Sequence, residues 1–181
     1  MVNDQQNSQQ IILVDEEDNA IGSIGKMEAH QRGLKHRALS IFIFNSKGEM
    51  LLQKRAFSKY HSGGLWSNAC CSHPFPDEPT KTAASRRLNE EMGFTTSLKK
   101  VFDFSYKASF ANGLTENEFD HVFVGEYEGE IKRNPEEVSD YLFKPMDEIK
   151  IELQDKPEKY TEWFKIAFPK IEAWWATNYP K

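Results

Sequence analysis

The sequence predicts a single α/β domain of the α+β class, in which strands and helices form packed layers. Strand-like segments occur before, between and after one central helical segment, and two more helical segments follow near the C-terminus. This order is typical of a sheet covered by helices. A chain of 181 residues with 39% hydrophobic residues can bury one substantial core. We expect one domain over residues 11–181, preceded by a disordered, Gln- and Asn-rich tail of residues 1–10.

Four short segments in the first half of the chain have the composition of strands. They are residues 11–15, 39–44, 50–54 and 65–71. The run Asn45-Ser46-Lys47-Gly48 is typical of a hairpin turn. We therefore expect 39–44 and 50–54 to lie side by side as antiparallel neighbours.

The hydrophobic period becomes helical from Thr80 onward. Ala84, Leu88 and Met92 recur every four residues, and Gly93 then provides a stop signal. These features predict a helix that begins at Thr80 and stops at Gly93. Beyond it we expect long strands at 101–110 and 117–127 around a turn at 111–113, a short strand at 140–143, and helices at 146–153 and 157–178.

Charge and composition exclude several classes of function. The formal net charge of −5 disfavours non-specific binding of nucleic acid or of an anionic membrane, because both need a basic face. Residues 1–10 lack the cationic start and apolar run of a signal peptide, and no run of about 18 apolar residues could span a membrane. Adjacent cysteines rarely form a disulfide, so we expect Cys70 and Cys71 to be reduced in a cytoplasmic protein.

Two separated clusters carry side chains that bind metals or transfer protons. The first is Cys71–His73 and the second is Glu116–Glu118. Residues i and i+2 of a strand point to the same face, so Glu116 and Glu118 can reach one cavity, and His73 lies on the same side as Cys71. A solvated strand face is the alternative for the glutamates, and a buried small side chain is the alternative for Cys71.

Histidines elsewhere in the chain complete a candidate metal-binding set. Three imidazoles, from His30, His36 and His73, and the two carboxylates would form a site suited to Mg²⁺, Mn²⁺ or Zn²⁺. The segment that carries His30 and His36 has only weak apolar periodicity. We expect the two remaining histidines, His61 and His121, to have surface or structural roles.

Cations near the same strand and helix indicate a phosphate-binding site. They are Lys54, Arg55, Lys59, Arg86 and Arg87. Ordinary surface charge is the alternative, most of all for Lys54 and Arg86. Glu90 and Glu91 lie near the C-terminal end of the predicted helix, where the helix dipole disfavours them. A divalent cation held by Glu91 would explain this placement, and a solvated helix face is the alternative.

The predicted helix resembles the core of the Nudix box, Gly-x5-Glu-x7-Arg-Glu-U-x-Glu-Glu-x-Gly-U, in which U is apolar. Ser72 stands in place of the first Gly, and the matching positions are Glu78, Arg86, Leu88, Glu90, Glu91, Gly93 and Phe94. Arg87 occupies a position that is Glu in pyrophosphohydrolases of this fold, which removes a carboxylate from their multi-metal cluster. The resemblance therefore implies the fold, a mixed sheet sandwiched between helices, and puts hydrolysis in doubt.

A more specific resemblance is to the type I isopentenyl-diphosphate isomerases. It is carried by Trp66–Pro74, Thr115–Glu118, Arg55–Lys59 and Asp103–Lys107, and it extends from about Ile12 to the C-terminal helix. These enzymes move the double bond of isopentenyl diphosphate to give dimethylallyl diphosphate through a tertiary carbocation, in isoprenoid biosynthesis. The resemblance implies an isomerase of a small diphosphate with no nucleic-acid or membrane partner, and we favour a monomer.

The resemblance also implies a role for each candidate residue. Cys71 and Glu118 would exchange protons on opposite faces of the substrate, with Tyr106 bonded to Glu118 and Trp163 stabilising the carbocation. A divalent metal ion, Mn²⁺, Mg²⁺ or Zn²⁺, would be held by His30, His36, His73, Glu116 and Glu118. The diphosphate would bind Lys26, Arg55, Lys59 and Arg87, together with Mg²⁺ on Glu91 and the backbone carbonyl of Cys71.

Two other functions stay open from the residues alone. A Nudix pyrophosphohydrolase of a nucleoside diphosphate derivative would use Glu90 and Glu91, but it would leave Cys71 without a task. A non-enzymatic metal-binding domain would use the ligands only to stabilise its fold, and it would show no turnover.

Overall fold

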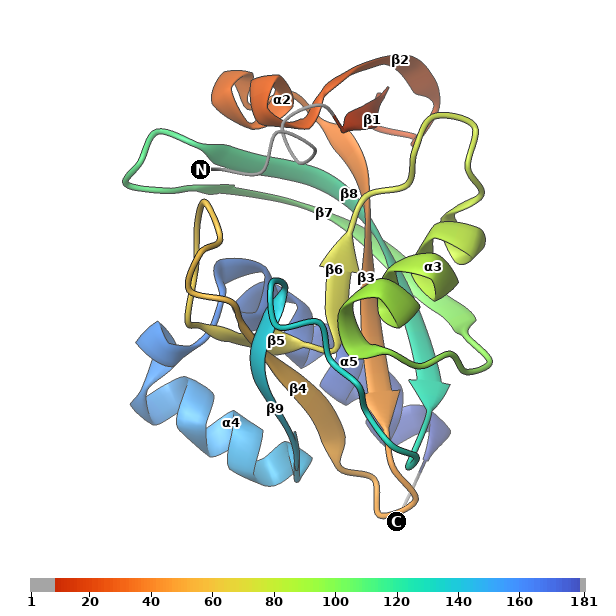
Figure 1. The fold of residues 1–181 in the computed structure, drawn as a ribbon, viewed down its shortest axis with the longest axis vertical. Helices are drawn as coiled ribbons and strands as arrows, with labels where there is room; N and C mark the ends of the chain where they lie inside the picture. Colours follow the sequence, from red (N-terminus) through yellow and green to blue (C-terminus); the bar gives the residue numbers. More distant parts are fainter. Residues whose placement is uncertain (1–8, 180–181) are drawn as a thin grey trace.

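A computed structural model describes residues 9–179, which form a mixed nine-stranded sheet with helices on both sides (Figure 1). The strands are β1 (Gln10–Val14), β2 (Ala20–Gly25), β3 (His36–Phe44), β4 (Met50–Arg55), β5 (Trp66–Asn68), β6 (Cys70–Ser72), β7 (Lys99–Ser109), β8 (Thr115–Glu126) and β9 (Val138–Lys144). The helices are α2 (Lys26–Arg32), α3 (Thr80–Met92), α4 (Met146–Asp155) and α5 (Glu162–Asn178), with a 3-10 helix at Pro157–Lys159. The predicted α+β domain, with its sheet between helices, is confirmed.

Strand β3 runs through the centre of the sheet and sets the positions of several polar side chains. It pairs in parallel with β8 along its whole length, and His36 stands beside Glu118. On its opposite edge it pairs in antiparallel with β6, and Ser40 stands beside Cys71. Nearly all of its residues are buried, as in a strand that is covered on both faces. Cys71 and Glu118 therefore come from the two strands that flank β3.

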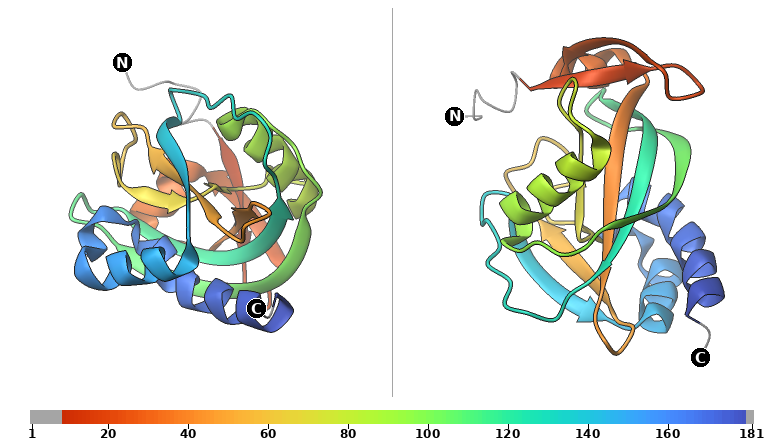
Figure 2. Two further views of the ribbon diagram at one scale, coloured as in Figure 1. Left: turned by 90° about the horizontal axis from the view of Figure 1, so that it is seen from below. Right: turned by 90° about the vertical axis from the view of Figure 1, so that its right-hand side faces the viewer.

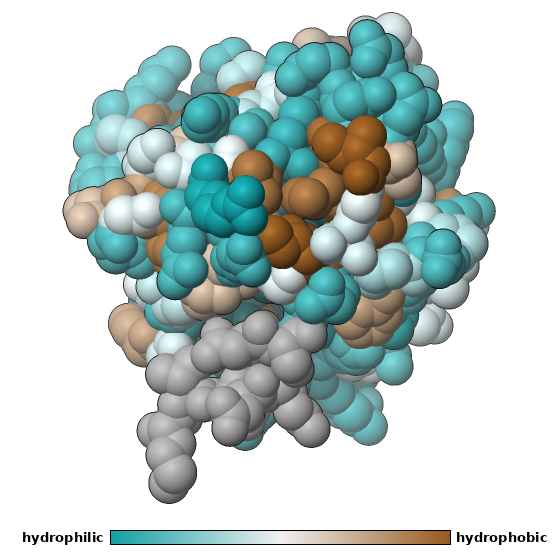
Figure 3. Space-filling model, turned by 90° about the horizontal axis from the view of Figure 1, so that it is seen from above, coloured by the Kyte–Doolittle hydropathy of each residue, from teal (hydrophilic) through white to brown (hydrophobic). Residues whose placement is uncertain are grey.

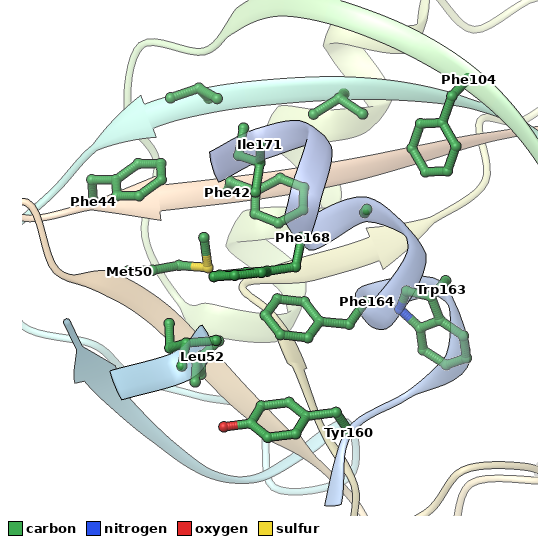
Figure 4. Close-up of a cluster of buried hydrophobic side chains, with 14 of the residues drawn as sticks. Phe42, Phe44, Met50, Leu52, Phe104, Tyr160, Trp163, Phe164, Phe168 and Ile171 are labelled. Atoms are coloured by element: carbon green, nitrogen blue, oxygen red, sulfur yellow. The ribbon is translucent and has the colours of Figure 1, made fainter. Parts of the chain in front are cut away.

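Hydrophobic clusters cover both faces of the sheet, and alternate residues of β3 belong to one or the other. In the first cluster, Phe164 and Phe168 of α5 pack over Phe42 and Met50 (Figure 4). The ring centroids of Phe42 and Phe164 are 6.4 Å apart. The second cluster includes Leu88 of α3. Figure 2 shows α3 and α5 on opposite sides of the strands, so the two helices seal the two faces.

Two elements, β2 and α2, were not predicted from the sequence pattern. β2 is largely exposed and pairs with β1, so its residues have no burial pattern that would identify a strand. α2 has only 7 residues, buries Ala29 and His30, and ends at Gly33, whose φ of 61° suits glycine. A helix this short has too little periodicity to be recognised. The end of the molecule that carries β1, β2 and α2 is mostly hydrophilic, with one small group of hydrophobic residues (Figure 3).

Three predicted segments have a different arrangement in the structure. The predicted strand 65–71 is divided into β5, which pairs with β4, and β6, which pairs with β3. β3 and β4 are paired at Phe44 and Met50, next to the turn, and then take different partners. The C-terminal helix begins at Glu162, after the 3-10 helix. Apart from Gln9 and Gln10, which begins β1, the predicted tail lies outside the described residues.

Candidate active site

A cavity of roughly 1030 Å³ is lined by residues from α2, α3, α5, the β4–β5 loop (residues 56–65) and strands β6, β7 and β8. Eleven of the predicted site residues line it: Lys26, Arg55, Lys59, Cys71, His73, Arg87, Glu91, Tyr106, Glu116, Glu118 and Trp163. The other two, His30 and His36, lie in a histidine and glutamate cluster with His73, Glu116 and Glu118. The fold therefore brings all of the predicted site residues together.

The histidine and glutamate cluster could hold a metal ion. One ligand atom from each of its buried members, His30, His36, His73, Glu116 and Glu118, lies within 4.8 Å of every other. The register of β3 and β8 places His36 beside Glu118, and Glu116 lies two residues earlier on the same face of β8. His30 comes from α2, and His73 follows β6 directly. Four separate segments of the chain thus converge on one point.

The hydrogen bonds of two cluster histidines leave one nitrogen of each ring available to a metal. Nδ1 of His30 donates to the carbonyl of Lys26 at 2.6 Å, and Nδ1 of His36 donates to the carbonyl of Leu34 at 2.8 Å. Neither Nε2 has a hydrogen-bond partner within residues 9–179. Nε2 of His30 lies 2.9 Å from Oε2 of Glu116. Metal-bound histidines usually have this arrangement, so the side chains fit a divalent ion.

Glu118 is held as a carboxylate by several donors. The hydroxyl of Tyr106 donates to its Oε2 at 2.6 Å, and Nε2 of His73 lies 2.9 Å from its Oε1. Burial raises the pKa of Glu118, but the imidazole of His36, with Nε2 at 3.5 Å from Oε1, and the hydrogen bond from Tyr106 lower it by more. Burial, followed by the negative charge of Glu118, raises the pKa of Tyr106 well above its ordinary value. A charged carboxylate therefore stands next to a phenol that keeps its proton.

The two cysteines point in opposite directions from β6, as strand alternation predicts. Cys70 is buried in the hydrophobic cluster that includes α3, whereas Cys71 lines the cavity. The thiol of Cys71 donates to Oδ1 of Asn68 at 3.1 Å, and its sulfur lies 3.5 Å from Oγ of Ser40. Burial and then the charge of Asp120 raise the pKa of Cys71 to about 12. This thiol therefore keeps its proton at neutral pH.

Five cations line the cavity and indicate an anion-binding wall: Arg86 and the four predicted to bind the diphosphate, Lys26, Arg55, Lys59 and Arg87. Burial, followed by repulsion from Lys59, lowers the pKa of Lys26 to about 8. Lys59 forms an ion pair with Glu137, and a guanidinium nitrogen of Arg87 lies 3.7 Å from the same carboxylate. Glu137 lies in the loop before β9 and matches no motif, so the sequence carries no signal for it.

Helix α3 contributes Arg86, Arg87, Glu90 and Glu91 to the cavity lining, and Glu91 is the buried carboxylate among them. Oε1 of Glu91 accepts a hydrogen bond from Arg87 at 2.5 Å, and Oε2 accepts one from the amide of Gln53 at 2.9 Å. The same guanidinium donates to Glu90 at 2.5 Å. Attraction to the surrounding acids outweighs burial and raises the pKa of Arg87, so it stays charged. Its charge is thus shared between two glutamates of its own helix.

Trp163 forms an aromatic wall of the cavity from the first turn of α5. Its indole nitrogen donates to Oγ of Ser67 at 2.8 Å, which fixes the orientation of the ring. The guanidinium of Arg55 lies 5.0 Å from the centre of the ring. The ring is only 5% exposed, so the wall excludes water from its side of the cavity.

The two remaining histidines have different outcomes. His61 is buried, lines the cavity, and has Nε2 at 2.9 Å from Oε1 of Glu116, so of the two expected roles the surface one is wrong. No periodic pattern could have placed it, because it lies in the β4–β5 loop. His121 is also buried, 2.8 Å from the carboxylate of Asp18 and outside the cavity lining, which agrees with a structural role.

Two solved structures have a similar fold at low sequence identity to this chain. The crystal structure of DR0079 from Deinococcus radiodurans has a TM-score of 0.75 at 16% identity and covers 90% of this chain and 98% of that one. The MutT protein from Methanosarcina mazei has a TM-score of 0.64 at 20% identity, and the match covers 77% of this chain and 94% of that one. At such low identity these structures identify the fold alone.

Sequence comparison identifies the family. The NUDIX domain model matches residues 34–164. Isopentenyl-diphosphate Delta-isomerase 2 of Aromatoleum aromaticum is 51% identical over 162 residues, which are 90% of this chain and 86% of that protein. Isopentenyl-diphosphate Delta-isomerase of Serratia proteamaculans is 52% identical over 154 residues, or 85% of this chain and 86% of that protein. The chain therefore carries a NUDIX domain and belongs to the isopentenyl-diphosphate Delta-isomerase family.

Proposed function

We propose that this protein interconverts isopentenyl diphosphate and dimethylallyl diphosphate, the activity that its relatives' names describe. The observation that carries the proposal is that Cys71 and Glu118, from the two strands that flank β3, line one cavity. The pKa of the thiol is raised and the pKa of the carboxyl group is lowered. At neutral pH one group therefore holds a proton and the other can accept one.

The reaction needs such a pair. Moving the double bond adds a proton to the terminal CH₂ carbon of the alkene and removes a proton from the carbon on the other side of the branch, so no net proton is gained or lost. One group must donate and another must accept, and each must reach the substrate in the correct protonation state. We assign these tasks to Cys71 and Glu118, with Tyr106 hydrogen-bonded to the carboxylate.

The carbocation between the two proton transfers must be stabilised and kept from water. Trp163 is the candidate, because its ring lines the cavity and is held by Ser67. A desolvated cation over an aromatic face gains roughly 2 kcal/mol. Tyr106, which is 8% exposed, contributes a second buried aromatic surface beside Glu118. An enclosed aromatic wall also lowers the chance that water traps the cation.

We propose that a divalent metal ion, Mn²⁺, Mg²⁺ or Zn²⁺, is held by His30, His36, His73, Glu116 and Glu118. When bound, it would supply a positive charge that keeps Glu118 ionised and fixed in orientation. The support is that Nε2 of His30, Nε2 of His36 and Oε2 of Glu116 are buried without hydrogen-bond partners among the described residues. Buried polar atoms of this kind need a partner.

We propose that the diphosphate binds to Lys26, Arg55, Lys59 and Arg87, together with Mg²⁺ on Glu91 and the backbone carbonyl of Cys71. The support is that these cations crowd into one wall of the cavity. The crowding is unfavourable, because repulsion from Lys59 contributes to the lowered pKa of Lys26. A bound polyanion would relieve that repulsion. Arg87 and Lys59 would then exchange part of their contact with Glu137 for contact with phosphate oxygens.

We also propose that the protein acts as a monomer in the cytoplasm, where it supplies isoprenoid synthesis. The support for the location is that Cys70 and Cys71 are both free thiols. Within residues 9–179, no helix has the length and apolar character that crossing a membrane requires. Sedimentation of the purified chain at several concentrations tests the monomer.

Product analysis tests the activity. The purified protein with Mg²⁺ and isopentenyl diphosphate should yield dimethylallyl diphosphate, and Cys71→Ala should abolish nearly all turnover without unfolding the chain. Cys70→Ala is the matched control, because it removes the neighbouring thiol from the hydrophobic cluster and leaves the cavity intact. Full activity of Cys71→Ala would defeat the assignment of the thiol, and absence of product from the parent protein would defeat the proposed function.

A further inference from the structure

We infer that His61 is a positioning residue that holds Glu116 in its metal-binding orientation and couples it to the aromatic wall. The inference rests on the proposed function only in that Glu116 is taken as a metal ligand. It concerns a residue outside the five-member histidine and glutamate cluster, in the part of the β4–β5 loop between the motif segments Arg55–Lys59 and Trp66–Pro74.

The two oxygens of Glu116 have different neighbours. Oε2 lies 2.9 Å from Nε2 of His30 and 3.8 Å from Nε2 of His36, so it faces the candidate metal ligands. Oε1 lies 2.9 Å from Nε2 of His61. That nitrogen is buried and lacks a well-aligned hydrogen bond among the described residues, so its polar contact is the ion pair with Oε1. Because a buried ring nitrogen needs a partner, Oε1 is the acceptor within its reach, and Oε2 is left for the metal.

Aromatic contacts fix the imidazole of His61. Its ring is stacked on Phe110, with centroids 4.7 Å apart and an interplanar angle of 11°. It meets Trp163 at 78°, with centroids 5.7 Å apart, and Tyr60 at 85°, with centroids 4.4 Å apart. Rings held on three sides cannot turn freely, so Nε2 stays directed toward Glu116.

Polar contacts support the same orientation. Nδ1 of His61 lies 3.2 Å from Oγ of Ser62, and when that hydroxyl donates, the ring proton is on Nε2, where Glu116 can accept it. The backbone carbonyl of His61 accepts a hydrogen bond from Arg55 at 3.3 Å. Arg55 in turn lies over Trp163. One residue of the β4–β5 loop therefore links a candidate metal ligand, the cation-stabilising ring and a diphosphate-binding arginine.

This arrangement matches the partners that orient metal ligands in other proteins. Removal of such a partner typically weakens metal binding by about 10- to 100-fold, because the ligand can rotate. Without His61, Oε1 of Glu116 would lose its ion-pair partner, and the carboxylate could rotate so that Oε2 no longer faces the candidate metal ligands. The expected consequence is weaker metal binding and a lower kcat, with little change in the KM for the diphosphate.

Calorimetric titration of the metal-free full chain with Mn²⁺ alone tests the inference. His61→Phe keeps the aromatic packing but removes Nε2, and it should weaken Mn²⁺ binding by about 10-fold or more. His61→Gln can still donate to Glu116, and it should recover most of the affinity. His121→Phe is the matched control, because it also removes a buried imidazole from a carboxylate, Asp18, but outside the cavity. It should bind Mn²⁺ like the parent.

Three results would overturn the inference. They are parent-like Mn²⁺ affinity in His61→Phe, equal weakening in His61→Phe and His61→Gln, or equal weakening in His121→Phe. If His61→Phe does not fold, which thermal unfolding would reveal, His61→Leu carries the same expectation. Mn²⁺ affinity that depends on His61 in a parent protein without isomerase activity would support this inference while defeating the proposed function.

Discussion

Two pairs of glutamates line the same cavity, one on β8 and one on α3, and their neighbours differ in kind. Glu116 and Glu118 of β8 lie against imidazoles and are almost fully buried. Glu90 and Glu91 of α3 lie against the guanidinium of Arg87. An imidazole can share a metal ion with a carboxylate, whereas a guanidinium has no lone pair to offer and neutralises the carboxylate instead. The β8 wall is therefore suited to a metal ion held by imidazoles and carboxylates. The α3 wall is suited to an anion, and the Mg²⁺ proposed at Glu91 would come with that anion.

This difference separates the isomerase from a hydrolase that uses the same fold. A pyrophosphohydrolase needs several metal-binding carboxylates on the helix, and Arg87 stands where such an enzyme carries one of them. In this protein the guanidinium of Arg87 also donates hydrogen bonds to carboxylate oxygens of both Glu90 and Glu91, so those oxygens already have a cationic partner. The likeness to a MutT protein therefore describes the architecture, and the side chains on the two walls decide the chemistry.

The largest expected effect is a difference in kcat between a substitution of a β8 glutamate and a substitution of an α3 glutamate. Glu118→Gln removes the charge that Tyr106 and His73 hold in place, so kcat should fall by at least about 1,000-fold. Glu90→Gln removes the charge of a side chain that is partly exposed and pairs with Arg87. Exposed ion pairs contribute little, so kcat should change by less than about 3-fold. Steady-state rates of dimethylallyl diphosphate formation measure both. Comparable losses in the two variants would mean that the walls are not functionally distinct.

Replacing Arg87 of α3 with the glutamate that hydrolases of this fold carry also tests the difference between the α3 and β8 walls. Arg87→Glu removes a cation from the α3 wall, where the diphosphate is proposed to bind. The KM for isopentenyl diphosphate should therefore rise by about 10- to 100-fold, as expected for the loss of a charged hydrogen bond. One added carboxylate does not rebuild a metal cluster, so no inorganic phosphate should be released. Arg87→Lys, which keeps the charge, is the control and should have an intermediate KM. Phosphate release by Arg87→Glu would revive the pyrophosphohydrolase as the function.

Local periodicity explains which parts of these walls could be predicted from the sequence. The alternation of a strand places Glu116 and Glu118 on one face, and it places Cys70 and Cys71 on opposite faces, with no knowledge of the rest of the fold. The α3 helix has a regular apolar stripe and a glycine stop, so its bounds were also predictable.

Residues on loops and short elements could not be placed in this way. His61 meets Glu116 only because the β4–β5 loop folds back over β8, and a loop carries no periodic signal. Glu137 reaches the cavity from another loop. His30 depends on α2, whose 7 residues are too few for a recognisable period. Residue types and the resemblance to a family predicted His30 and His36 as metal ligands, but the convergence of their nitrogens needed the three-dimensional structure.

A smaller effect is expected from pH at the β8 wall. Burial lowers the pKa of His30, but the carboxylate of Glu116, whose Oε2 lies 2.9 Å from Nε2, raises it above its ordinary value of 6.5. A protonated imidazole cannot bind a metal, so binding must release this proton, and affinity must fall as the pH falls. Between about pH 8 and about pH 6, the Mn²⁺ affinity should fall by about 10-fold or more.

Calorimetry in two buffers of different ionisation enthalpy measures the released proton directly. His30→Gln is the control, because it removes the titrating ligand and should flatten the dependence of log affinity on pH. Equal affinity at both pH values in the parent protein would contradict a metal site that contains His30.

The smallest effect is expected from Arg86, the neighbour of Arg87. Its guanidinium forms two parallel hydrogen bonds to Glu78, at 2.8 and 2.7 Å, and lies 4.1 Å from the ring centre of Phe75. These contacts tie α3 to the loop after β6, and they are partly open to solvent, so Arg86→Ala should cost about 0.5–1 kcal/mol of unfolding free energy. Its kcat/KM should stay within about 2-fold of the parent, whereas Arg87→Ala should raise the KM strongly. Thermal unfolding measures the stability change, and steady-state kinetics measure the KM. Equal KM increases in the two alanine variants would mean that the α3 wall binds the diphosphate through its total charge, and that the position of Arg87 is not special.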